Sequence, residues 1–428
     1  MCGIIAQTNP ASCRIYGIAE ARVNKRVVII NAVAGIFLLA VAGFTALVIY
    51  TRADCAAVGY REDKGQVASA PEFFASNYSS ARKKFRAASR SSGARLEQIQ
   101  HPNLGPDGQE LFTDIALLGD ADAKIFLVLV SGTHGVEGFA GSAIQVGILE
   151  SGIQQDLPAG TALLMIHAIN PYGMAHLRRF NEHNVDVNRN FLDHESPPPN
   201  NRAYRELAGY IAPESMSLPS EIAALARLVW FRLTAGKAAT KVAISGGQYT
   251  HPMGLFFGGR SETWSNNTFT SYVTRYLHGA KEVVAIDIHT ALGPFGTAQL
   301  LPNIDPESEE HRYAKAIWDQ SLFSEIAPGK TANSYLSATV KSAMERLLPE
   351  TRVTSVTLEF GTYPSWDVFM ALRAENWLHN YGGDSHPQSE AIKTCLLRTY
   401  YPDSAKWKLS VWDGGRDVVE QAFFYLAQ

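Results

Sequence analysis

The chain has 428 residues, of which 46% are hydrophobic and 18% are charged. This is the composition of an ordinary globular protein, and it is too apolar for a disordered chain. The formal net charge is −3, from 38 basic and 41 acidic residues. Nucleic-acid binders usually carry a basic surplus, so we expect no nucleic-acid partner. The 4 cysteines form no CxxC pair, so a bound metal would need His and carboxylate ligands.

Residues 27–50 form an uncharged apolar run, VVIINAVAGIFLLAVAGFTALVIY. At about 1.5 Å per residue, a helix of this length can cross a bilayer core of roughly 30 Å. The alternative is a buried core helix, but the run is apolar on all sides and precedes the body of the chain. We therefore expect a single transmembrane anchor, after an N-terminal tail at 1–26 and before a polar linker at 51–70. The basic residues before the run predict a cytoplasmic N-terminus and an extracytoplasmic domain at 71–428.

Four apolar runs in this domain read as buried strands: 124–131, 161–169, 282–289 and 354–360. Helical spacing follows the first run, at 141–153. Buried strands without polar alternation favour a mixed α/β fold with a mostly parallel sheet and helices on both faces. Ligands of such sheets bind beyond the carboxyl ends of the strands, so the residues after each run are the candidates for chemistry.

His134 and Glu137 follow the first strand in the sequence SGTHGVEG. Imidazole and carboxylate groups three residues apart on a turn can reach one zinc ion. A similar pair, His183 and Asp186, lies in a polar stretch and is interpreted as a chance match. His289, at the end of the third strand, could complete a His/Glu/His site with an open position for water. Alternation puts Asp287 on the same face, either as a partner of that histidine or as a packed carboxylate.

The other strand ends carry arginines and one more carboxylate. Arg178 and Arg179 come after the second strand, before the sequence DVNRNF. Arginine binds carboxylates and stabilises oxyanions, although a solvated basic loop would look the same. Glu359 lies in the apolar fourth strand, where an unpaired carboxylate is costly to bury, and beside an activated water it would be a general base. A Gly-rich segment at 245–260 either shapes a pocket or forms a tight loop.

The order of the motifs HGVE, NPYG, an arginine before DVNRNF, DIHTALG and TLEFGT resembles the zinc carboxypeptidase superfamily. The resemblance is greatest to its succinylglutamate desuccinylase/aspartoacylase-like branch, and it covers roughly 124–362. It implies a phosphorylase/hydrolase-like α/β fold, here preceded by the N-terminal hydrophobic helix, and one zinc ion per chain. The implied site residues are the metal ligands His134, Glu137 and His289, the catalytic Glu359, the oxyanion-stabilising Arg179 or Arg178, the substrate-carboxylate pair Asn188 and Arg189, and the substrate-closing Tyr335.

The predicted activity is zinc-dependent hydrolysis of amide bonds by an activated water, with Glu359 as general base. A metallocarboxypeptidase acting on peptides with a free carboxylate is favoured, because NRNF is closer to the carboxypeptidase form. The alternative is a deacylase of N-acyl amino acids, whose substrates also carry a carboxylate. A non-catalytic, membrane-tethered binding protein with the same fold is a third interpretation. It would lack a ligand or the catalytic glutamate, and neither is missing here.

Overall fold

The computed structural model describes residues 71–120, 122–302, 307–323 and 338–428. All of these residues belong to one compact unit, Cys55–Gln428. The predicted tail at 1–26, the anchor at 27–50, the linker at 51–70 and Tyr335 lie outside the described residues.

A seven-stranded sheet in the order β1-β2-β4-β3-β5-β7-β6 forms the centre of the fold. The four predicted runs are β3, β4, β5 and β7, which are adjacent and mutually parallel. The strands are β1 (Arg95–Leu104), β2 (Glu110–Gly119), β3 (Ile125–Val130), β4 (Thr161–His167), β5 (Glu282–Thr290), β6 (Ala298–Leu301) and β7 (Arg352–Phe360).

The mixed α/β class is confirmed, but the sheet is not mostly parallel. The pairings β1/β2, β2/β4 and β6/β7 are antiparallel, and they lie on both sides of the parallel centre. The physical reason for the β1/β2 pairing is the short turn between these strands, in which the N–H of Gly105 donates to the carbonyl of Gln109 at 2.8 Å. A connection this short can join only antiparallel neighbours, because a parallel pair needs a long crossover.

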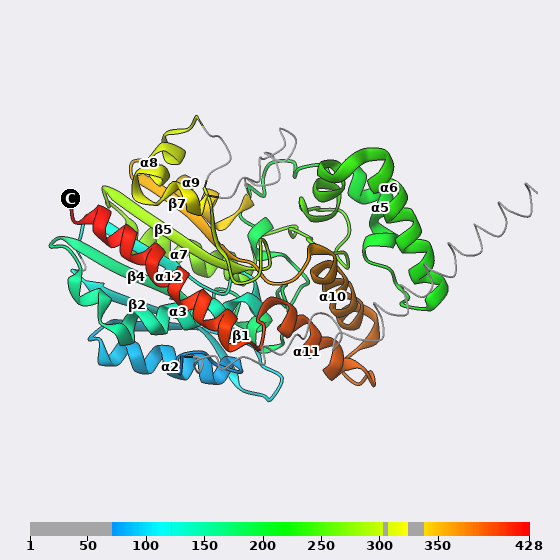
Figure 1. Cartoon of the computed structure of the whole chain (residues 1–428), viewed down its shortest axis with the longest axis horizontal. Coiled ribbons are helices and arrows are strands. Elements are labelled where there is room, and N and C mark those ends of the chain that lie inside the picture. Colours follow the sequence, from blue (N-terminus) through cyan, green and yellow to red (C-terminus); the bar gives the residue numbers. More distant parts are fainter. Residues whose placement is uncertain (1–70, 121, 303–306, 324–337) are drawn as a thin grey trace, which may run out of the picture. The chain divides into compact units, whose positions relative to one another are not determined.

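Helices cover both faces of the sheet, and the alternation of side chains along β3 separates the two cores. Leu127 and Leu129 face the first core, with α2, α3 and α12, whereas Phe126 and Val128 face the second, with α7 and α9. Figure 1 shows α12 running across the sheet beside α3, and these two helices are in contact. The covering helices are α2 (Tyr78–Ser91), α3 (Gly138–Ser151), α7 (Trp264–Leu277), α8 (Glu309–Ile317), α9 (Val340–Leu347) and α12 (Ala405–Leu426).

A helical lobe with a third core is formed by α5 (Arg202–Ile211), α6 (Leu218–Ser245), α10 (Ser365–Trp377) and α11 (Ser389–Tyr400). A buried ion pair joins its helices: the Arg373 guanidinium binds both carboxylate oxygens of Glu221, at 2.8 and 3.1 Å, and neither side chain is exposed. Phe256 and Ala291 pack into the same core, so the lobe is continuous with the loops at the strand ends.

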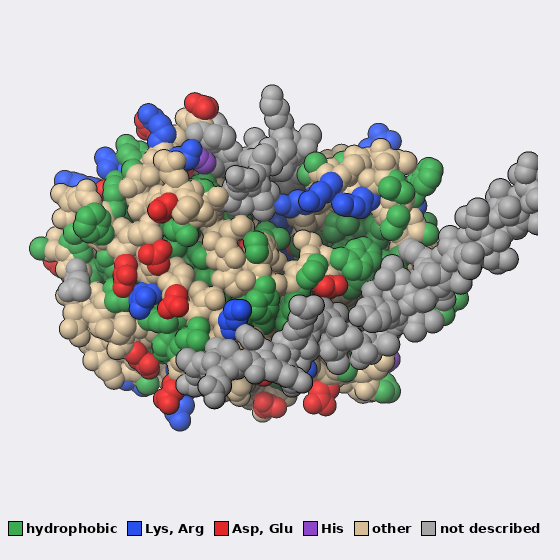
Figure 2. Space-filling model, in the orientation of Figure 1, with side chains coloured by type: hydrophobic (Ala, Val, Ile, Leu, Met, Phe, Trp, Pro, Cys, Tyr) green, Lys and Arg blue, Asp and Glu red, His purple; other side chains and the backbone are tan. Residues whose placement is uncertain are grey.

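Within the described part of the chain, no helix combines the length and the apolarity needed to cross a bilayer. The long helices α6 and α12, with 28 and 22 residues, both carry charged side chains along their length. Figure 2 shows acidic and basic side chains interspersed on the face that α12 covers. This finding contradicts the expected localisation, a single-pass membrane protein with an extracytoplasmic domain, and we withdraw it.

The buried pair in the helical lobe predicts a large loss of stability when one partner is neutralised. Glu221→Gln leaves the guanidinium of Arg373 buried without a compensating charge, which costs about 3–5 kcal/mol. The control is Glu206→Gln, because Glu206 pairs at 2.9 Å with Arg202 on the exposed surface of α5. That change should alter stability by less than about 0.5 kcal/mol. Urea unfolding followed by tryptophan fluorescence measures both, and equal midpoints would contradict the prediction.

Candidate metal centre

The predicted metal ligands meet at the carboxyl ends of the parallel strands. His134 and Glu137 lie in the turn after β3, which contains the short 3₁₀ helix η1 (Gly135–Glu137), and His289 lies at the end of β5. His289 and Glu359 are register partners on β5 and β7, so their side chains lie on the same face of the sheet. The sheet therefore brings together residues that are more than 200 positions apart in sequence.

Three potential ligand atoms converge in this space. Nδ1 of His134 lies 2.9 Å from Oε1 of Glu137 and 3.1 Å from Nδ1 of His289. Nδ1 of His289 lies 3.0 Å from Oε2 of Glu137. All three residues are buried, and they form a His/Glu/His group that could hold a metal ion. Ligands of a tetrahedral ion at about 2.1 Å would be separated by about 3.4 Å, so a small expansion of the group admits one.

Both histidines bind a carboxylate through the ring nitrogen that points away from this centre. Nε2 of His289 lies 2.6 Å from Asp287, whose other oxygen accepts a hydrogen bond from the Thr133 hydroxyl at 2.8 Å. Nε2 of His134 lies 3.1 Å from Asp186 and 2.8 Å from Nη2 of Arg179. At His289, the carboxylate fixes the tautomer that leaves Nδ1 free to bind a metal, and it orients the ring. The sequence leaves Asp287 as either a partner of His289 or a packed carboxylate, and the structure favours the first interpretation.

The carboxylates of the centre outnumber its guanidinium groups, which favours the binding of a cation. Among the described residues, Arg179 is the guanidinium bonded to the network of Glu137, Asp186 and Asp287: its Nη1 lies 2.6 Å from Glu137, and its Nε and Nη2 lie 3.4 Å from Asp186. Although burial lowers the pKa of His289, Asp287 and Glu137 raise it well above its ordinary value, so a proton on this ring offsets part of the negative charge. With both histidines neutral, as metal ligands are, the network would have two negative charges in excess, the charge that a divalent ion would neutralise. The donor types, their convergence and this charge all fit a bound zinc ion.

The local pKa values follow from the same arrangement. Burial alone would raise the pKa of Asp186, but Arg179 and His134 lower it below its usual range. Burial and the neighbouring charge of Glu137 raise the pKa of Glu359 to about 8. Glu359 is 5% exposed, and one of its oxygens accepts a hydrogen bond from the backbone N–H of Leu292 at 3.0 Å. A cation bound beside this carboxylate would lower its pKa again.

Glycine at position 135 allows the turn that carries the candidate ligands His134 and Glu137 to form. The backbone N–H groups of Gly135 and Val136 donate to the carbonyls of Arg179 and Arg178, at 3.2 and 2.9 Å. A Cβ atom at position 135 would overlap backbone atoms of Gly173, Met174 and Arg178. The motifs HGVE, NPYG and Arg-Arg are therefore three parts of one tightly packed backbone arrangement.

The two adjacent arginines have different surroundings. Arg178 is 1% exposed and points into the helical lobe, where it binds Glu375 at 2.6 Å and Asn184 at 2.8 Å. Arg179 points to the metal centre, and its guanidinium lies over the ring of Phe256, 5.4 Å from the ring centroid. Of the two candidates for an oxyanion-stabilising residue, only Arg179 lies beside the His/Glu/His group.

Asn188 and Arg189 lie in the loop after β4. The side-chain oxygen of Asn188 accepts from the N–H of Val340, at the start of α9, at 2.9 Å. The guanidinium of Arg189 donates to the backbone carbonyls of Asn188 and Ser245, at 2.8 and 3.0 Å, and its buried Nε has no partner among the described residues. This cation is oriented by backbone groups, which do not neutralise its charge.

The Gly-rich segment at 245–260 wraps around Arg189. Gly247 has φ +94°, and a Cβ atom there would lie 2.9 Å from Cδ of Arg189. The hydroxyl of Tyr249 donates to the Arg189 carbonyl at 2.7 Å. The sequence leaves two interpretations of this segment open, a segment that shapes a pocket or a tight loop. The structure combines them, because the tight loop shapes the surroundings of Arg189.

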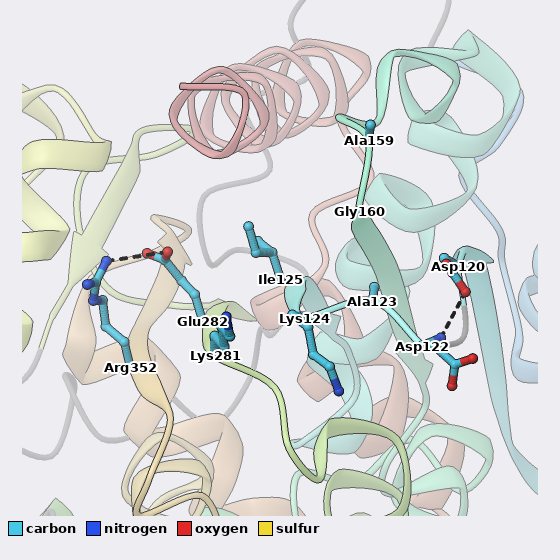
Figure 3. Close-up of a pocket in the computed structure, with 10 residues that line it drawn as sticks. All are labelled: Asp120, Asp122, Ala123, Lys124, Ile125, Ala159, Gly160, Lys281, Glu282 and Arg352. Atoms are coloured by element: carbon cyan, nitrogen blue, oxygen red, sulfur yellow. Dashed lines mark hydrogen bonds and ion pairs between the residues drawn. The ribbon is translucent and has the colours of Figure 1, made fainter.

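A separate hollow lies at the opposite ends of the strands. Figure 3 shows its lining, which includes Lys124, Lys281 and Arg352, with Arg352 paired to Glu282. These residues stand at the amino ends of β3, β5 and β7, whereas the metal centre lies at the carboxyl ends. The hollow is therefore not part of the candidate site.

Two residues of the centre were missed or misjudged in the sequence. Asp186 was seen only as part of a chance HxxD match with His183. The side chain of His183 is indeed 76% exposed, but Asp186 is fully buried and binds His134. Its position at the start of DVNRNF was the available signal. Tyr400, at the end of α11, carried no signal, although its backbone carbonyl accepts a hydrogen bond at 2.7 Å from the hydroxyl of Thr290, the residue after His289.

The fold and this buried His/Glu/His group define an α/β protein with a candidate metal centre. Residues 74–414 match the model of a family described as "Protein of unknown function (DUF2817)", and the chain belongs to that family. Comparison with curated proteins finds no match.

Several solved structures resemble the chain. Bovine thrombin-activatable fibrinolysis inhibitor, in complex with tick carboxypeptidase inhibitor, is 11% identical, with 80% of this chain and 97% of that chain covered and a TM-score of 0.38. Carboxypeptidase A from Helicoverpa armigera is 12% identical, with coverages of 82% and 74% and a TM-score of 0.38. Succinylglutamate desuccinylase from Chromobacterium violaceum is 16% identical, with coverages of 75% and 74% and a TM-score of 0.32.

The names of these structures include a carboxypeptidase and a succinylglutamate desuccinylase, the two groups that the order of the sequence motifs resembles. The similarities concern the fold, and they say nothing about the chemistry of this chain.

The packing of the metal-binding turn predicts that Gly135→Ala disrupts the centre. The added methyl group must displace the backbone at Gly173 or Arg178, which moves Glu137 and Arg179 apart. We expect the variant to bind divalent metal at least roughly 10-fold more weakly, as when an outer partner of a metal ligand is lost. The control is Gly209→Ala in α5, where a Cβ atom meets nothing within 4 Å. Metal titration of both full-length variants tests this, and equal affinities would contradict it.

Proposed function

We propose that the protein is a zinc-dependent hydrolase of amide bonds whose substrates carry a free carboxylate. Among these hydrolases we favour a metallocarboxypeptidase that acts on peptides, over a deacylase of N-acyl amino acids. The single observation that supports the proposal best is the convergence of Nδ1 of His134, Nδ1 of His289 and the carboxylate of Glu137, with Nε2 of His289 bound to the carboxylate of Asp287. Zinc held there would polarise the scissile carbonyl and make water more acidic.

Glu359 is proposed as the general base. Its position beside His289 puts the carboxylate next to the metal centre, and the hydrogen bond from Leu292 N–H fixes one of its oxygens. The other oxygen can accept the proton of the attacking water and then pass it to the leaving amine. A base of this kind is effective when its pKa lies near the working pH, and burial moves the pKa of Glu359 in that direction.

Arg179 is proposed to donate to the oxyanion that develops on the scissile carbonyl. Its guanidinium lies beside Glu137 and His134, so a carbonyl bound at the centre would be within reach. A donor that is already oriented toward the developing charge stabilises the transition state without reorganisation. Its bonds to Glu137 and Asp186 hold that orientation.

Arg189 is proposed to bind the substrate carboxylate, with Asn188 assisting. The guanidinium donates to two backbone carbonyls, which carry no formal charge, so its charge remains available to a ligand. No carboxylate forms an ion pair with it among the described residues, although the charge of Arg189 acts on Asp186, and a bound carboxylate would supply such a partner. Peptides with a free C-terminus and N-acyl amino acids both provide such a group.

The first experiment tests the metal and the substrate together. A panel of peptides and N-acyl amino acids is incubated with the zinc-loaded full-length chain, with and without a chelator. We expect hydrolysis that the chelator abolishes and zinc restores, and a zinc content of one per chain. His289→Ala should lose zinc and activity together, because it removes one of three ligands. The control is His183→Ala, since this side chain is exposed and should change neither.

Each outcome of the panel has a definite meaning. Hydrolysis of peptides alone supports a carboxypeptidase, and hydrolysis of N-acyl amino acids alone supports a deacylase. Bound zinc without hydrolysis of any substrate would favour a non-catalytic binding protein and reject the proposed activity. Zinc retained in full by His289→Ala would show that the ligand group is wrong.

Glu359 and Arg189 should fail in different ways when they are replaced. Glu359→Gln keeps the shape but cannot accept a proton, so kcat should fall by roughly 10²–10⁴-fold while zinc stays bound. Arg189→Ala removes a contact to the substrate carboxylate, so KM should rise with little change in kcat if that contact is equally strong in the ground and transition states. Steady-state kinetics and zinc analysis of both variants measure these effects.

The control for the first variant is Glu282→Gln, at the opposite end of β5, which should keep wild-type kinetics. A near-normal kcat for Glu359→Gln would remove this residue from the mechanism. An unchanged KM of Arg189→Ala for every carboxylate substrate would exclude an exopeptidase or deacylase that uses this arginine.

A further inference from the structure

Phe256 has a backbone conformation that bulky residues rarely adopt. Its φ is +56°, in the left-handed region, where a Cβ atom is strained against the backbone. The side chain is buried, with 6% of it exposed. Strain of this kind persists only where the surrounding structure fixes the backbone, and it is concentrated at functional sites. The conformation of Phe256 therefore points to a task for its ring.

Hydrogen bonds within the Gly-rich segment hold this backbone. The N–H of Gln248 donates to the carbonyl of Phe256 at 3.0 Å, and the N–H of Gly258 donates to the carbonyl of Gln248 at 2.9 Å. The buried amide of Gln248 fills the inside of the loop, where its Nε2 donates to the carbonyls of His251 and Leu255, at 2.7 and 3.3 Å. The bonds of the loop itself therefore set the direction of the Phe256 ring.

This ring lies beneath the guanidinium of Arg179, whose Cζ is 5.4 Å from the ring centroid. The nitrogen atoms of the guanidinium contact other groups: Nη1 lies 2.6 Å from Glu137, and Nη2 lies 3.4 Å from Asp186 and 2.8 Å from Nε2 of His134. An aromatic ring attracts a cation through its π electrons and carries no formal charge. Phe256 can therefore hold the guanidinium without neutralising it, which a further carboxylate could not do.

The backbone around Phe256 is also joined to the other neighbours of Arg179. The carbonyl of Phe257 accepts a hydrogen bond from the N–H of Asp186, an acidic partner of the guanidinium, at 2.7 Å. Phe180, the residue after Arg179, packs edge to face on the Phe256 ring, with centroids 6.1 Å apart and ring planes at 87°. The same short stretch of chain therefore fixes the ring, the acidic partner and the backbone next to the arginine.

We infer that Phe256 is a positioning residue, whose ring keeps the Arg179 guanidinium oriented for its contact with the reacting carbonyl. This inference rests on the proposed function, because it assigns Phe256 a task through Arg179. The ring also keeps water from one side of the guanidinium, and a charge in a drier space interacts more strongly with a developing oxyanion. The Gly-rich segment then has two tasks, because it surrounds Arg189 as well.

The test compares Phe256→Leu with Phe85→Leu in the zinc-loaded full-length chain. Both variants replace a buried ring with an apolar side chain, but Phe85 lies on α2 in the first core and stacks on the imidazole of His167, with centroids 4.3 Å apart. Loss of a buried contact between a ring and a cation predicts a roughly 5- to 30-fold fall in kcat for Phe256→Leu. KM and zinc content should not change, because the oxyanion develops only in the transition state. Phe85→Leu should keep the wild-type kcat.

A double-variant cycle shows whether Phe256 acts through Arg179. In an Arg179→Ala background, the change Phe256→Leu should have little further effect, because the group that the ring positions is gone. Equal effects of Phe256→Leu in both backgrounds would overturn the inference, and so would an unchanged kcat of the single variant. A loss of zinc, or a fall in melting temperature much larger than that of Phe85→Leu, would assign Phe256 a structural role instead.

A second readout does not depend on hydrolysis. Phenylglyoxal modifies accessible arginines, and fragment spectra of the peptide that contains Arg178 and Arg179 distinguish the two sites. We expect Phe256→Leu to increase the modification rate of Arg179 several-fold, while the buried Arg178 serves as an internal reference and Phe85→Leu has no effect. An unchanged rate would overturn the inference even if the enzyme is active. An increased rate in a protein that hydrolyses no substrate would reject the proposed function and keep the positioning contact.

Discussion

The excess of negative charge in a buried space is the constraint on which the rest of the structure depends. Glu137, Asp186 and Asp287 are each at most 2% exposed, and Arg179 is the guanidinium in contact with this network. Buried charges without compensation are among the most costly features that a protein can contain. A site of this kind is stable only with a cation in it or with its groups held firmly by the surrounding fold. Burial, and then the neighbouring charge of Glu137, raise the pKa of Glu359 in the same space.

The sheet and the helical lobe position different residues of the candidate site. The parallel strands supply the ligands at fixed positions, because their carboxyl ends share one edge of the sheet. The helical lobe and the loops around it fix the arginines: Glu375 binds Arg178, and the Gly-rich segment surrounds Arg189. The ligand group is therefore held by the sheet, and the groups that would contact a substrate are held by the parts of the chain that lie outside it.

The sequence was sufficient to predict the four parallel strands and the residues directly after them. Continuous apolar runs gave β3, β4, β5 and β7, and the polar residues at their ends include His134, Glu137 and His289. The edge strand β1 was not predicted because its exposed, polar sequence RLEQIQHPNL has no apolar pattern. The buried β2 and the short β6 were not predicted either, so the antiparallel pairings on both sides were missed. The apolar run at 27–50 dominated the prediction of localisation, and none of the described helices supports that prediction.

The remaining parts of the site depend on contacts that no local pattern reveals. Arg178 and Arg179 are neighbours of the same type, and only packing against Glu375 decides which of them points away. Asp186 binds His134, which lies 52 positions away in the sequence. The histidine near it in the sequence, His183, has an exposed side chain and is not its partner. Tertiary contacts of this length are set by the sheet topology, which was predicted only in part.

The hydrogen bond between Thr290 and Tyr400 spans 110 positions, and it has a consequence for how the protein folds. Closing long loops is slow because chain entropy must be lost before the contact stabilises the product. The three candidate metal ligands are all present once the ribosome has passed His289, whereas Tyr400 is added 110 residues after Thr290. The nascent chain can therefore bring these candidate ligands together before the hydrogen bond between Thr290 and the end of α11 can form.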